Sequence, residues 1–455
     1  MKKIISAFVL LLLVALVAGL SFLFFFKFEG DPPEIKKILI PEPLGKKGKI
    51  LLEVSDKRSG IRNIRVLLSQ NQHRKILFEK DNPVDLLWGA SAREERLEIL
   101  FEPLKLGFRS GKAKLFLEIS DGSWRNGLKG NVLQVERDIL LDLDSPRIVI
   151  RSPIHYLSPG GSNLVVYSIS EKVKRHGVLL NKRFFEGYSL PHGDGLYFAL
   201  VALPIEEKEI TRMFVEAEDL AGNVSRLPVA YYVRKKRYRH DVINISDAFL
   251  KRKIPEFLER YPEIPQDDLL KAFIYINSEM RKKNNATISE LTRRSRIKGF
   301  YGDKALLRLP KSATRALFGD HRTYYYKRRE IGRAVHLGID LASVARAPVP
   351  AAAEGKVVFA DYLGIYGNTI IVDHGLGLFT LYAHLAGFTV SVGDMVKRGQ
   401  LIGYTDTTGL AGGDHLHFSV LVQGVFVEPI EWFDPHWVRT RITEKLPKKT
   451  ESKPE

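Results

Sequence analysis

The stretch "GGDHLHFSVLVQGVFVEP", residues 412–429, alternates like two strands joined by a tight turn. Gln423 and Gly424 stand where a β-hairpin turn is expected. Residues i and i+2 of a strand project from the same face, so His415 and His417 direct two imidazoles toward one point. The stretch therefore predicts an antiparallel sheet that carries a pair of histidines on one face.

Further candidate ligands lie upstream of this hairpin. The segment "HLGID" places His336 and Asp340 four residues apart, which suits one face of a helix or strand but stays undecided in a loop. His384 in "LYAHL" lies on another predicted strand. Two imidazoles and a carboxylate match a catalytic zinc site, which keeps a fourth position open for water. The chain has no cysteine, which excludes disulfides and thiolate metal sites.

Five motifs follow one another within approximately residues 316–435, namely "HLGIDLA", "YGNTIIVDHG", "LYAHL", "VGDMVKRGQLIG" and "GGDHLHF". In this order they resemble the lysostaphin-type, or LytM-like, zinc metallopeptidases. The resemblance implies a compact, mostly antiparallel β domain with an open groove, one zinc ion (Zn2+), and hydrolysis of peptide bonds in peptidoglycan. Position by position, it implies the zinc ligands His336, Asp340 and His417 and the catalytic, non-ligand histidines His384 and His415.

The expected chemistry assigns a task to each of the two catalytic histidines. His415 is the candidate general base that takes a proton from water, and His384 is the candidate donor to the tetrahedral oxyanion. The sequence leaves open whether these two roles are shared or exchanged.

Other polar residues of the region are given weaker roles. We expect a turn role for His374 in "VDHG" and no substrate contact for His321 in "FGDHRTYYY". Members of the family often carry a tyrosine before the first ligand. Here Glu330 stands in that neighbourhood and Tyr324 to Tyr326 lie further upstream, so a tyrosine role stays open. Residues 407–409, "TTG", are expected to form a turn beside the groove.

The N-terminal segment "MKKIISAFVLLLLVALVAGLSFLFFFK" has no charge from Ile4 to Phe26. This length exceeds the roughly 20 residues that cross a bilayer as a helix. A cleaved signal peptide is the alternative, but its apolar region is usually only about 7–15 residues long. We expect an uncleaved single-pass anchor in the inner (cytoplasmic) membrane, with Lys2 and Lys3 in the cytoplasm and the bulk of the chain in the periplasm or outside the cell.

Between the anchor and the peptidase-like region, period-two stretches such as "KLFLEISD" and "MFVEAED" predict two β-sandwich modules. Short turns of the "DLAGN" kind make them resemble bacterial immunoglobulin-like modules. A helical connector follows. Ser246 is its expected first N-cap, Pro255 is expected to interrupt that helix, and Thr287 is expected to start another.

The fold class predicted for the whole chain is multidomain and mainly β. The expected domains are a transmembrane anchor (1–27), β-sandwich module 1 (31–142), β-sandwich module 2 (143–235), a helical connector (243–311), the LytM-like peptidase domain (312–440) and a disordered tail (441–455).

The chain of 455 residues has a formal charge of +17, which favours anionic surroundings such as a membrane surface or wall polymer. Nucleic acid is not an expected partner outside the cell. The leading hypothesis is therefore a membrane-anchored zinc endopeptidase that cuts peptide cross-links of peptidoglycan. The alternatives are a non-catalytic LytM-like protein that binds the wall or activates an amidase, with a cell-wall amidase or division protein as partner, and a scaffold led by the β modules.

Overall fold

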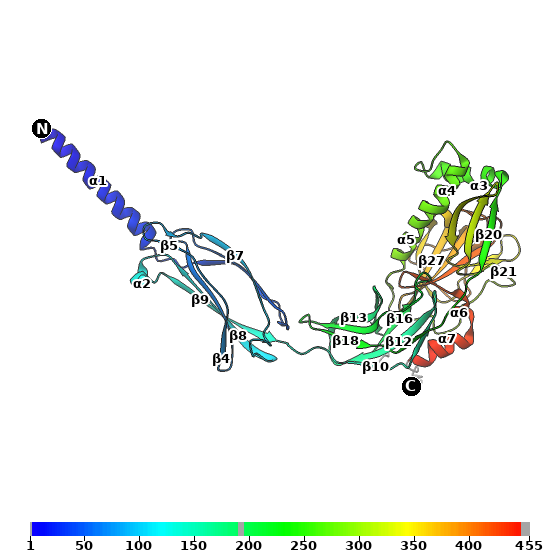
Figure 1. Cartoon of the computed structure of the whole chain (residues 1–455), viewed down its shortest axis with the longest axis horizontal. Coiled ribbons are helices and arrows are strands. Elements are labelled where there is room, and N and C mark those ends of the chain that lie inside the picture. Colours follow the sequence, from blue (N-terminus) through cyan, green and yellow to red (C-terminus); the bar gives the residue numbers. More distant parts are fainter. Residues whose placement is uncertain (1, 190–194, 447–455) are drawn as a thin grey trace. The chain divides into compact units, whose positions relative to one another are not determined.

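The computed structural model describes residues 2–189 and 195–446. The packing divides the chain into two compact units. Unit 1 comprises Met1–Pro146, Glu171–Arg175 and Glu218–Ser225, and unit 2 comprises Arg147–Ser170, His176–Ala217 and Arg226–Glu455. Strands are the main element of both units, as the sequence predicts (Figure 1).

Unit 1 begins with one long apolar helix, after which antiparallel strands form two sheets. The sheets have the orders β1-β2-β7 and β4-β3-β8-β9, and a short hairpin pairs β5 with β6. The elements are α1 (Lys2–Lys27), β1 (Glu34–Leu39), β2 (Gly48–Ser55), β3 (Ile61–Gln70), β4 (His73–Asp81), β5 (Val84–Asp85), β6 (Gly89–Ala90), β7 (Glu94–Phe101), β8 (Gly111–Asp121), α2 (Arg125–Leu128) and β9 (Val132–Leu141).

The two sheets of unit 1 share one apolar core. Every second residue of β8, including Leu115, Leu117 and Ile119, is buried and packs with residues of β2 and β3. This alternation confirms the period-two prediction for the segment. Two antiparallel sheets over one core make a β-sandwich, whereas its immunoglobulin-like character stays a prediction.

The first part of unit 2 contains two more antiparallel sheets, β10-β12-β16-β15 and β14-β13-β17-β18, and a parallel pair, β11 and β19. Met213, Val215 and Ala217 on β17 are buried in alternation, again as predicted. The strands are β10 (Ile148–Ile150), β11 (His155–Leu157), β12 (Ser162–Ile169), β13 (Val173–Leu180), β14 (Arg183–Glu186), β15 (Tyr188–Ser189), β16 (Leu196–Ala202), β17 (Met213–Asp219), β18 (Val224–Pro228) and β19 (Tyr231–Val233).

The second part of unit 2 is built on a 10-stranded sheet whose central order is β21-β24-β31-β28-β27-β26-β29. A separate sheet, β20-β22-β23, pairs β20 with β22 in parallel. The strands are β20 (His240–Ile245), β21 (Ala313–Ala316), β22 (His321–Tyr326), β23 (Arg329–Val335), β24 (Ile339–Ala342), β25 (Pro348–Pro350), β26 (Gly355–Tyr362), β27 (Asn368–Gly375), β28 (Leu378–Phe388), β29 (Met395–Val396), β30 (Leu401–Thr405), β31 (Leu416–Val422) and β32 (Val425–Val427).

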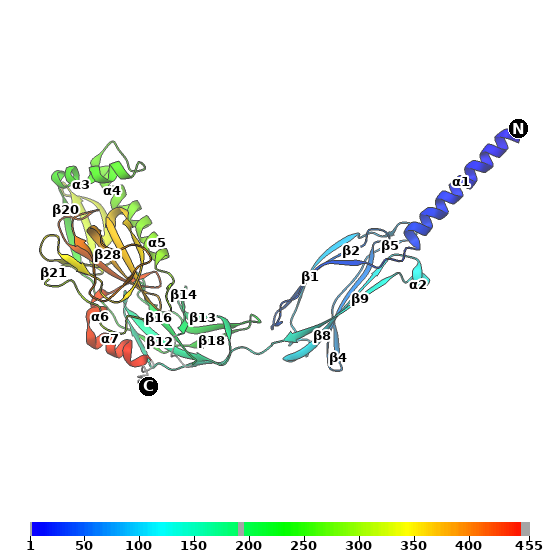
Figure 2. The same ribbon diagram turned by 180° about the vertical axis from the view of Figure 1, so that it is seen from behind.

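Helices cover one side of this sheet, with α5 beside β27 in Figure 1 and beside the sheet labelled at β28 in the reverse view (Figure 2). Buried side chains of these helices and of β27, β28 and β31 belong to one apolar cluster. The helical segments are α3 (Asp247–Arg260), α4 (Leu269–Tyr275), η1 (Ile276–Met280), α5 (Arg281–Leu291), η2 (Gly364–Tyr366), α6 (Pro429–Phe433), α7 (Pro435–Arg441) and η3 (Thr443–Lys445).

The helix boundaries agree with the sequence in part. Ser246 is the N-cap of α3, and its side chain accepts a hydrogen bond from the N–H of Phe249. The predicted interruption at Pro255 is wrong, because α3 continues through it at the cost of one missing backbone donor. The predicted helix start at Thr287 is also wrong. Thr287 lies inside α5, and its hydroxyl donates to the carbonyl oxygen of Lys283.

The C-terminal part of unit 2 contacts β12 through polar side chains. The indole N–H of Trp432 donates to Ser162 Oγ at 3.1 Å, and Lys445 Nζ donates to Asn163 Oδ1 at 2.6 Å. A disordered tail was expected from residue 441, yet the described chain is folded through η3. The rest of the expected tail, 447–455, lies outside the described residues.

Candidate metal centre

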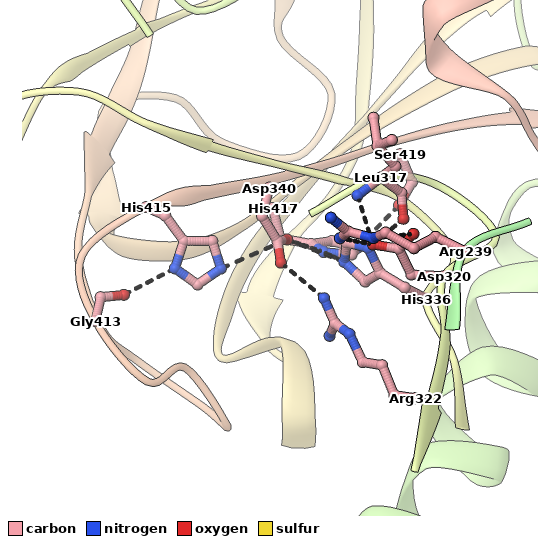
Figure 3. Close-up of polar contacts among 10 residues, drawn as sticks. All are labelled: Arg239, Leu317, Asp320, Arg322, His336, Asp340, Gly413, His415, His417 and Ser419. Carbon is pink, nitrogen blue, oxygen red and sulfur yellow. Dashed lines mark hydrogen bonds and ion pairs between the residues drawn. The ribbon is translucent and has the colours of Figure 1, made fainter. Parts of the chain in front are cut away.

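Three of the predicted site residues meet between neighbouring strands (Figure 3). Asp340 on β24 lies directly opposite His417 on β31 in the antiparallel register, and His336 follows the end of β23. Asp340 Oδ1 is 3.0 Å from His336 Nε2 and 2.9 Å from His417 Nδ1, and these two nitrogens are 3.0 Å apart. Strand pairing therefore brings together residues that are far apart in the chain.

The outer hydrogen bonds of the two histidines fix their protonation at these positions. His336 Nδ1 donates to the carbonyl oxygen of Leu317 at 2.8 Å. His417 Nε2 is 3.1 Å from Ser419 Oγ, and that hydroxyl itself donates to the carbonyl oxygen of Leu337. The inner nitrogens, His336 Nε2 and His417 Nδ1, are thus left with lone pairs.

Three electron-pair donors therefore face one another within about the span of a single ion. A cation at their centre turns this repulsion into coordination, and a donor set of two imidazoles and one carboxylate fits zinc with one open position. Gly338 permits the close approach, since a Cβ there would lie 2.6 Å from His417 Nε2. The residues present fit the metal that the resemblance implies.

Arg322 on β22 holds the other oxygen of the carboxylate. Its Nη2 is 3.1 Å from Asp340 Oδ2, and both side chains are largely buried. Burial raises the pKa of Asp340, but the close approach of His336, His415 and His417 outweighs burial and holds the pKa well below its usual range. Asp340 is therefore an ionised ligand whose second oxygen is fixed by a guanidinium.

Sequence reasoning missed Arg322, because it lies on the separate sheet of β20, β22 and β23 and belongs to none of the matched motifs. The only sequence signal was its position beside His321. His321 itself is exposed and stacks on His240, with the ring centroids 5.3 Å apart. It does not contribute to the lining of the pocket described below.

His384 and His415 lie beside the three ligand candidates. Their ring centroids are 4.9 Å apart, and His415 Nε2 is 3.5 Å from Asp340 Oδ1. His384 Nδ1 donates to the carbonyl oxygen of Thr408, and His415 Nδ1 donates to that of Gly413, both at 2.7 Å. Each ring therefore keeps its Nε2 for the centre.

The backbone around these two histidines departs from a regular strand. His384 has a positive φ of 60°, which is rare for a residue with a side chain. This irregularity in β28 changes the direction of its ring from the one that a regular strand would give. His415 lies one residue before β31 and forms an isolated bridge with Asp406. The predicted hairpin is present, with Gln423 and Gly424 both at positive φ between β31 and β32.

The five predicted site residues open into a pocket of about 500 Å³. Its other wall comes from the end of β20 and from α3, including Phe249 and Arg252. Arg252 donates to the carbonyl oxygen of Gly412 at 3.3 Å, so α3 reaches the loop that carries His415. The pocket wall is basic, because Arg281 and Arg322 also line it.

The remaining residues considered from the sequence have structural contacts. His374 is fully buried, with Nδ1 donating to the carbonyl oxygen of Glu354 and Nε2 2.7 Å from Thr380 Oγ1. Tyr324 lines the pocket. Tyr366, which the sequence did not single out, packs against His417 with ring centroids 5.4 Å apart. Its position inside the "YGNTIIVDHG" motif was the available signal.

Comparison with known proteins confirms the family resemblance. Residues 334–429 match the model of peptidase family M23. Over 96 residues the chain is 40% identical to the DD-carboxypeptidase/endopeptidase Mpg of Neisseria meningitidis, covering 21% of this chain and 22% of that protein. It is 41% identical over 93 residues to the peptidoglycan DD-endopeptidase ShyB of Vibrio cholerae, covering 20% of this chain and 22% of that protein.

A match of similar extent is to a protein with a different role. The murein hydrolase activator EnvC of Escherichia coli is 39% identical over 84 residues, covering 18% of this chain and 20% of that protein. The chain thus spans about a fifth of the length of the curated relatives it matches. Among solved structures, a putative M23 peptidase of Pseudomonas aeruginosa aligns with a TM-score of 0.37 at 21% identity, over 62% of this chain and 96% of that one.

Proposed function

Because the C-terminal part of this chain carries a domain of peptidase family M23, we propose that the protein is a membrane-anchored zinc endopeptidase that hydrolyses peptide cross-links of peptidoglycan. The observation that carries the proposal is the convergence of His336, Asp340 and His417, with the free Nε2 atoms of His384 and His415 beside them. The ligand set supports metal binding, and the two further histidines support proton transfer next to it.

A zinc ion held by the three ligands would supply a Lewis acid that polarises the scissile carbonyl and a water molecule. His415 Nε2 takes the proton of the attacking water as general base. His384 Nε2 stands across from it and, once it carries a proton, donates a hydrogen bond to the charge that develops on the carbonyl oxygen. The two rings present the same free atom, so the division of these two tasks between them stays open.

Arg322 acts on the reaction through Asp340. By holding Oδ2, it leaves Oδ1 aimed between the two ligand histidines. The basic wall formed with Arg252 and Arg281 suits a substrate that carries carboxylates, as the peptides of peptidoglycan do. The substrate class thus agrees with the charge of the pocket as well as with the names of the relatives.

Location is part of the same proposal. One helix, Ile4–Phe25, is long and apolar enough to cross a membrane. We assign it as an uncleaved anchor in the inner membrane, with the rest of the chain in the periplasm. The expected partners are peptidoglycan and the membrane, with no nucleic acid.

The alternative function is a non-catalytic activator of a cell-wall amidase, favoured by the similarity to EnvC. A digest of purified peptidoglycan separates the two. The full chain in detergent, loaded with zinc, is expected to release fragments with new peptide termini detectable by mass spectrometry. Release of no fragments by zinc-loaded protein, together with stimulation of an added amidase, would establish the activator instead.

A further inference from the structure

Unit 1 holds a second cluster of buried acidic groups. Glu29 follows α1, Asp56 follows β2, and Asp121 ends β8. One carboxylate oxygen from each lies within 4.8 Å of the others. The residues are 4%, 6% and 0% exposed, respectively. Three buried carboxylates at this separation repel one another, so the arrangement favours a positive charge among them.

The neighbouring basic side chains do not supply that charge at the centre. Arg58 is 41% exposed, its Nε is 3.7 Å from Glu29 Oε2, and its Nη1 pairs with the exposed Asp31. Lys27 is buried nearby, but its Nζ donates to a backbone carbonyl oxygen. Burial consequently raises the pKa of both Glu29 and Asp56.

A buried hydroxyl beside the carboxylates is an independent sign of a ligand. Ser59 is 1% exposed, and within the described part of the chain its Oγ has no hydrogen-bond partner. Its N–H donates to Glu29 Oε1 at 2.8 Å. The hydroxyl lies beside the same carboxylate but makes no hydrogen bond with it. This oxygen is available to a cation.

Backbone amides hold two of the carboxylates in place. Asp56 Oδ1 accepts two backbone N–H bonds, at 3.0 and 2.7 Å. Asp121 Oδ1 also accepts two, at 3.0 and 2.8 Å, and its Oδ2 accepts one from Asn131 Nδ2. The acids are therefore fixed before any ligand arrives, which lowers the entropic cost of binding.

We propose that Glu29, Asp56, Asp121 and the Ser59 hydroxyl bind a calcium ion. All four donors are oxygen atoms, which suit a hard cation, and the cluster contains no imidazole that would favour zinc. Calcium accepts irregular oxygen cages, whereas magnesium demands a near-octahedral shell and retains its waters. Bound calcium would tie the segment that leaves α1 to the ends of β2 and β8.

The same framework recurs at the other end of unit 1. Asp142, Glu171 and Asp219 also bring one ligand atom each within 4.8 Å. Asn223 Nδ2 donates to Asp219 Oδ2 and to the carbonyl oxygen of Asp142, just as Asn131 Nδ2 donates to Asp121 Oδ2 and to the carbonyl oxygen of Glu29. Glu171 is exposed, so we propose no metal site at this second cluster.

The test uses the full chain in detergent, stripped of calcium with a chelator and then dialysed with zinc. Titration with CaCl2 in a calorimeter is expected to give at least one equivalent of binding and to raise the melting temperature of a unit-1 transition by about 5 °C. Glu29→Gln and Ser59→Ala remove one donor each and preserve the packing. Glu29→Gln is expected to lose one equivalent or to weaken that equivalent at least about tenfold, because affinity follows the charge of the ligands.

Asp31→Asn is the matched control, since Asp31 is an exposed acid beside Arg58 and outside the cluster. It is expected to bind calcium as the unmodified chain does. Circular dichroism and zinc content verify that each variant is folded. The proposal is overturned if the unmodified chain binds no calcium at 10 mM (about tenfold above the Kd of the weakest extracellular sites), if folded Glu29→Gln binds as the control does, or if MgCl2 binds as tightly as CaCl2.

Discussion

Each histidine around the candidate metal centre is oriented by a hydrogen bond from the ring nitrogen that points away from it. The acceptors are the carbonyl oxygens of Leu317, Thr408 and Gly413 and the hydroxyl of Ser419. A carbonyl oxygen accepts only, so it selects the tautomer of the ring that donates to it. The rings therefore need little rearrangement when a metal or a substrate arrives. The effect of replacing a histidine depends on whether its inner nitrogen binds the metal or transfers a proton.

Replacing a ligand is expected to remove metal and activity together. His336→Ala, Asp340→Ala or His417→Ala deletes one of three protein donors, and two donors do not hold zinc tightly. Elemental analysis after dialysis checks this, with His321→Ala as the matched control because His321 lies outside the pocket. Stoichiometric zinc in folded His417→Ala would show that the ligand assignment is wrong.

Replacing a catalytic histidine is expected to lower activity without removing the metal. His384→Ala and His415→Ala leave the three ligands in place, so zinc content stays near one per chain while turnover of peptidoglycan falls by on the order of 10²–10⁴. Comparing zinc content with initial rates of fragment release measures both. Loss of zinc from His415→Ala would assign that ring to the metal instead.

His374 gives a pH dependence to folding. Burial lowers its pKa to about 4, against about 6.5 in an unfolded chain. The neutral ring therefore contributes stability that is fully present above pH 6.5 and is lost as the pH falls toward 4, by up to about 1.4 kcal/mol per pH unit. Chemical unfolding between pH 7 and 5 is expected to show a shallower decline for His374→Gln. An identical pH slope would contradict this origin.

At the scale of elements, the sequence predicts what local patterns determine. Alternation predicted β8, β17 and the β31–β32 hairpin, and Ser246 predicted the start of α3, because each depends on neighbours in the chain. The role of Arg322 was not predictable, since it depends on how β22 lies beside β24. The predictions of a helix interruption at Pro255 and a helix start at Thr287 were wrong because tertiary packing sustains helices through residues that are unfavourable in isolation.

The helical connector shares its core with the peptidase sheet, which changes how its role must be tested. Ile254 and Phe257 of α3 and Phe379 and Leu381 of β28 belong to one buried cluster. One hypothesis is that the connector covers the groove, and a chain that starts near residue 312 would test it by removing the connector. That truncation also removes one side of the core.

A chain of residues 312–446 is therefore expected to be unfolded or insoluble, whereas residues 147–446 fold. Losing the partners of a buried Phe or Leu costs about 2–5 kcal/mol for each side chain, and total stability is only about 5–15 kcal/mol. Circular dichroism melts and zinc content check the two fragments. Cooperative melting of both at the same temperature would contradict the shared core. It would then make truncation a valid test of occlusion.

At the scale of the whole molecule, composition indicates that the parts of the chain differ, but it does not determine where one part ends and the next begins. The apolar N-terminus, the β-rich middle and the histidine motifs each have a distinct composition. By contrast, Glu171–Arg175 and Glu218–Ser225 pack with unit 1 although the chain around them belongs to unit 2. These two segments combine strand ends with turns, and no periodic signal in the sequence marks them, so the predicted domain limits remain predictions.

The helix α1 should stay attached to the mature protein. Its side chains are largely exposed, with Ile4 74% and Leu11 69% exposed, and no other described element covers the apolar span. At 1.5 Å per residue, the 22 residues of Ile4–Phe25 reach about 33 Å, enough for a bilayer core of about 30 Å.

We expect the chain to remain in the membrane after an alkaline wash and to yield N-terminal peptides that begin before Ala18. Val14→Arg is expected to shift the chain toward the soluble fraction, because arginine at the centre of a span costs about 2.5–3.5 kcal/mol. Leu100→Arg, at an exposed apolar position of β7, is the matched control and should leave fractionation unchanged. A mature N-terminus near residue 20, in a chain that the wash releases, would establish a cleaved signal peptide instead.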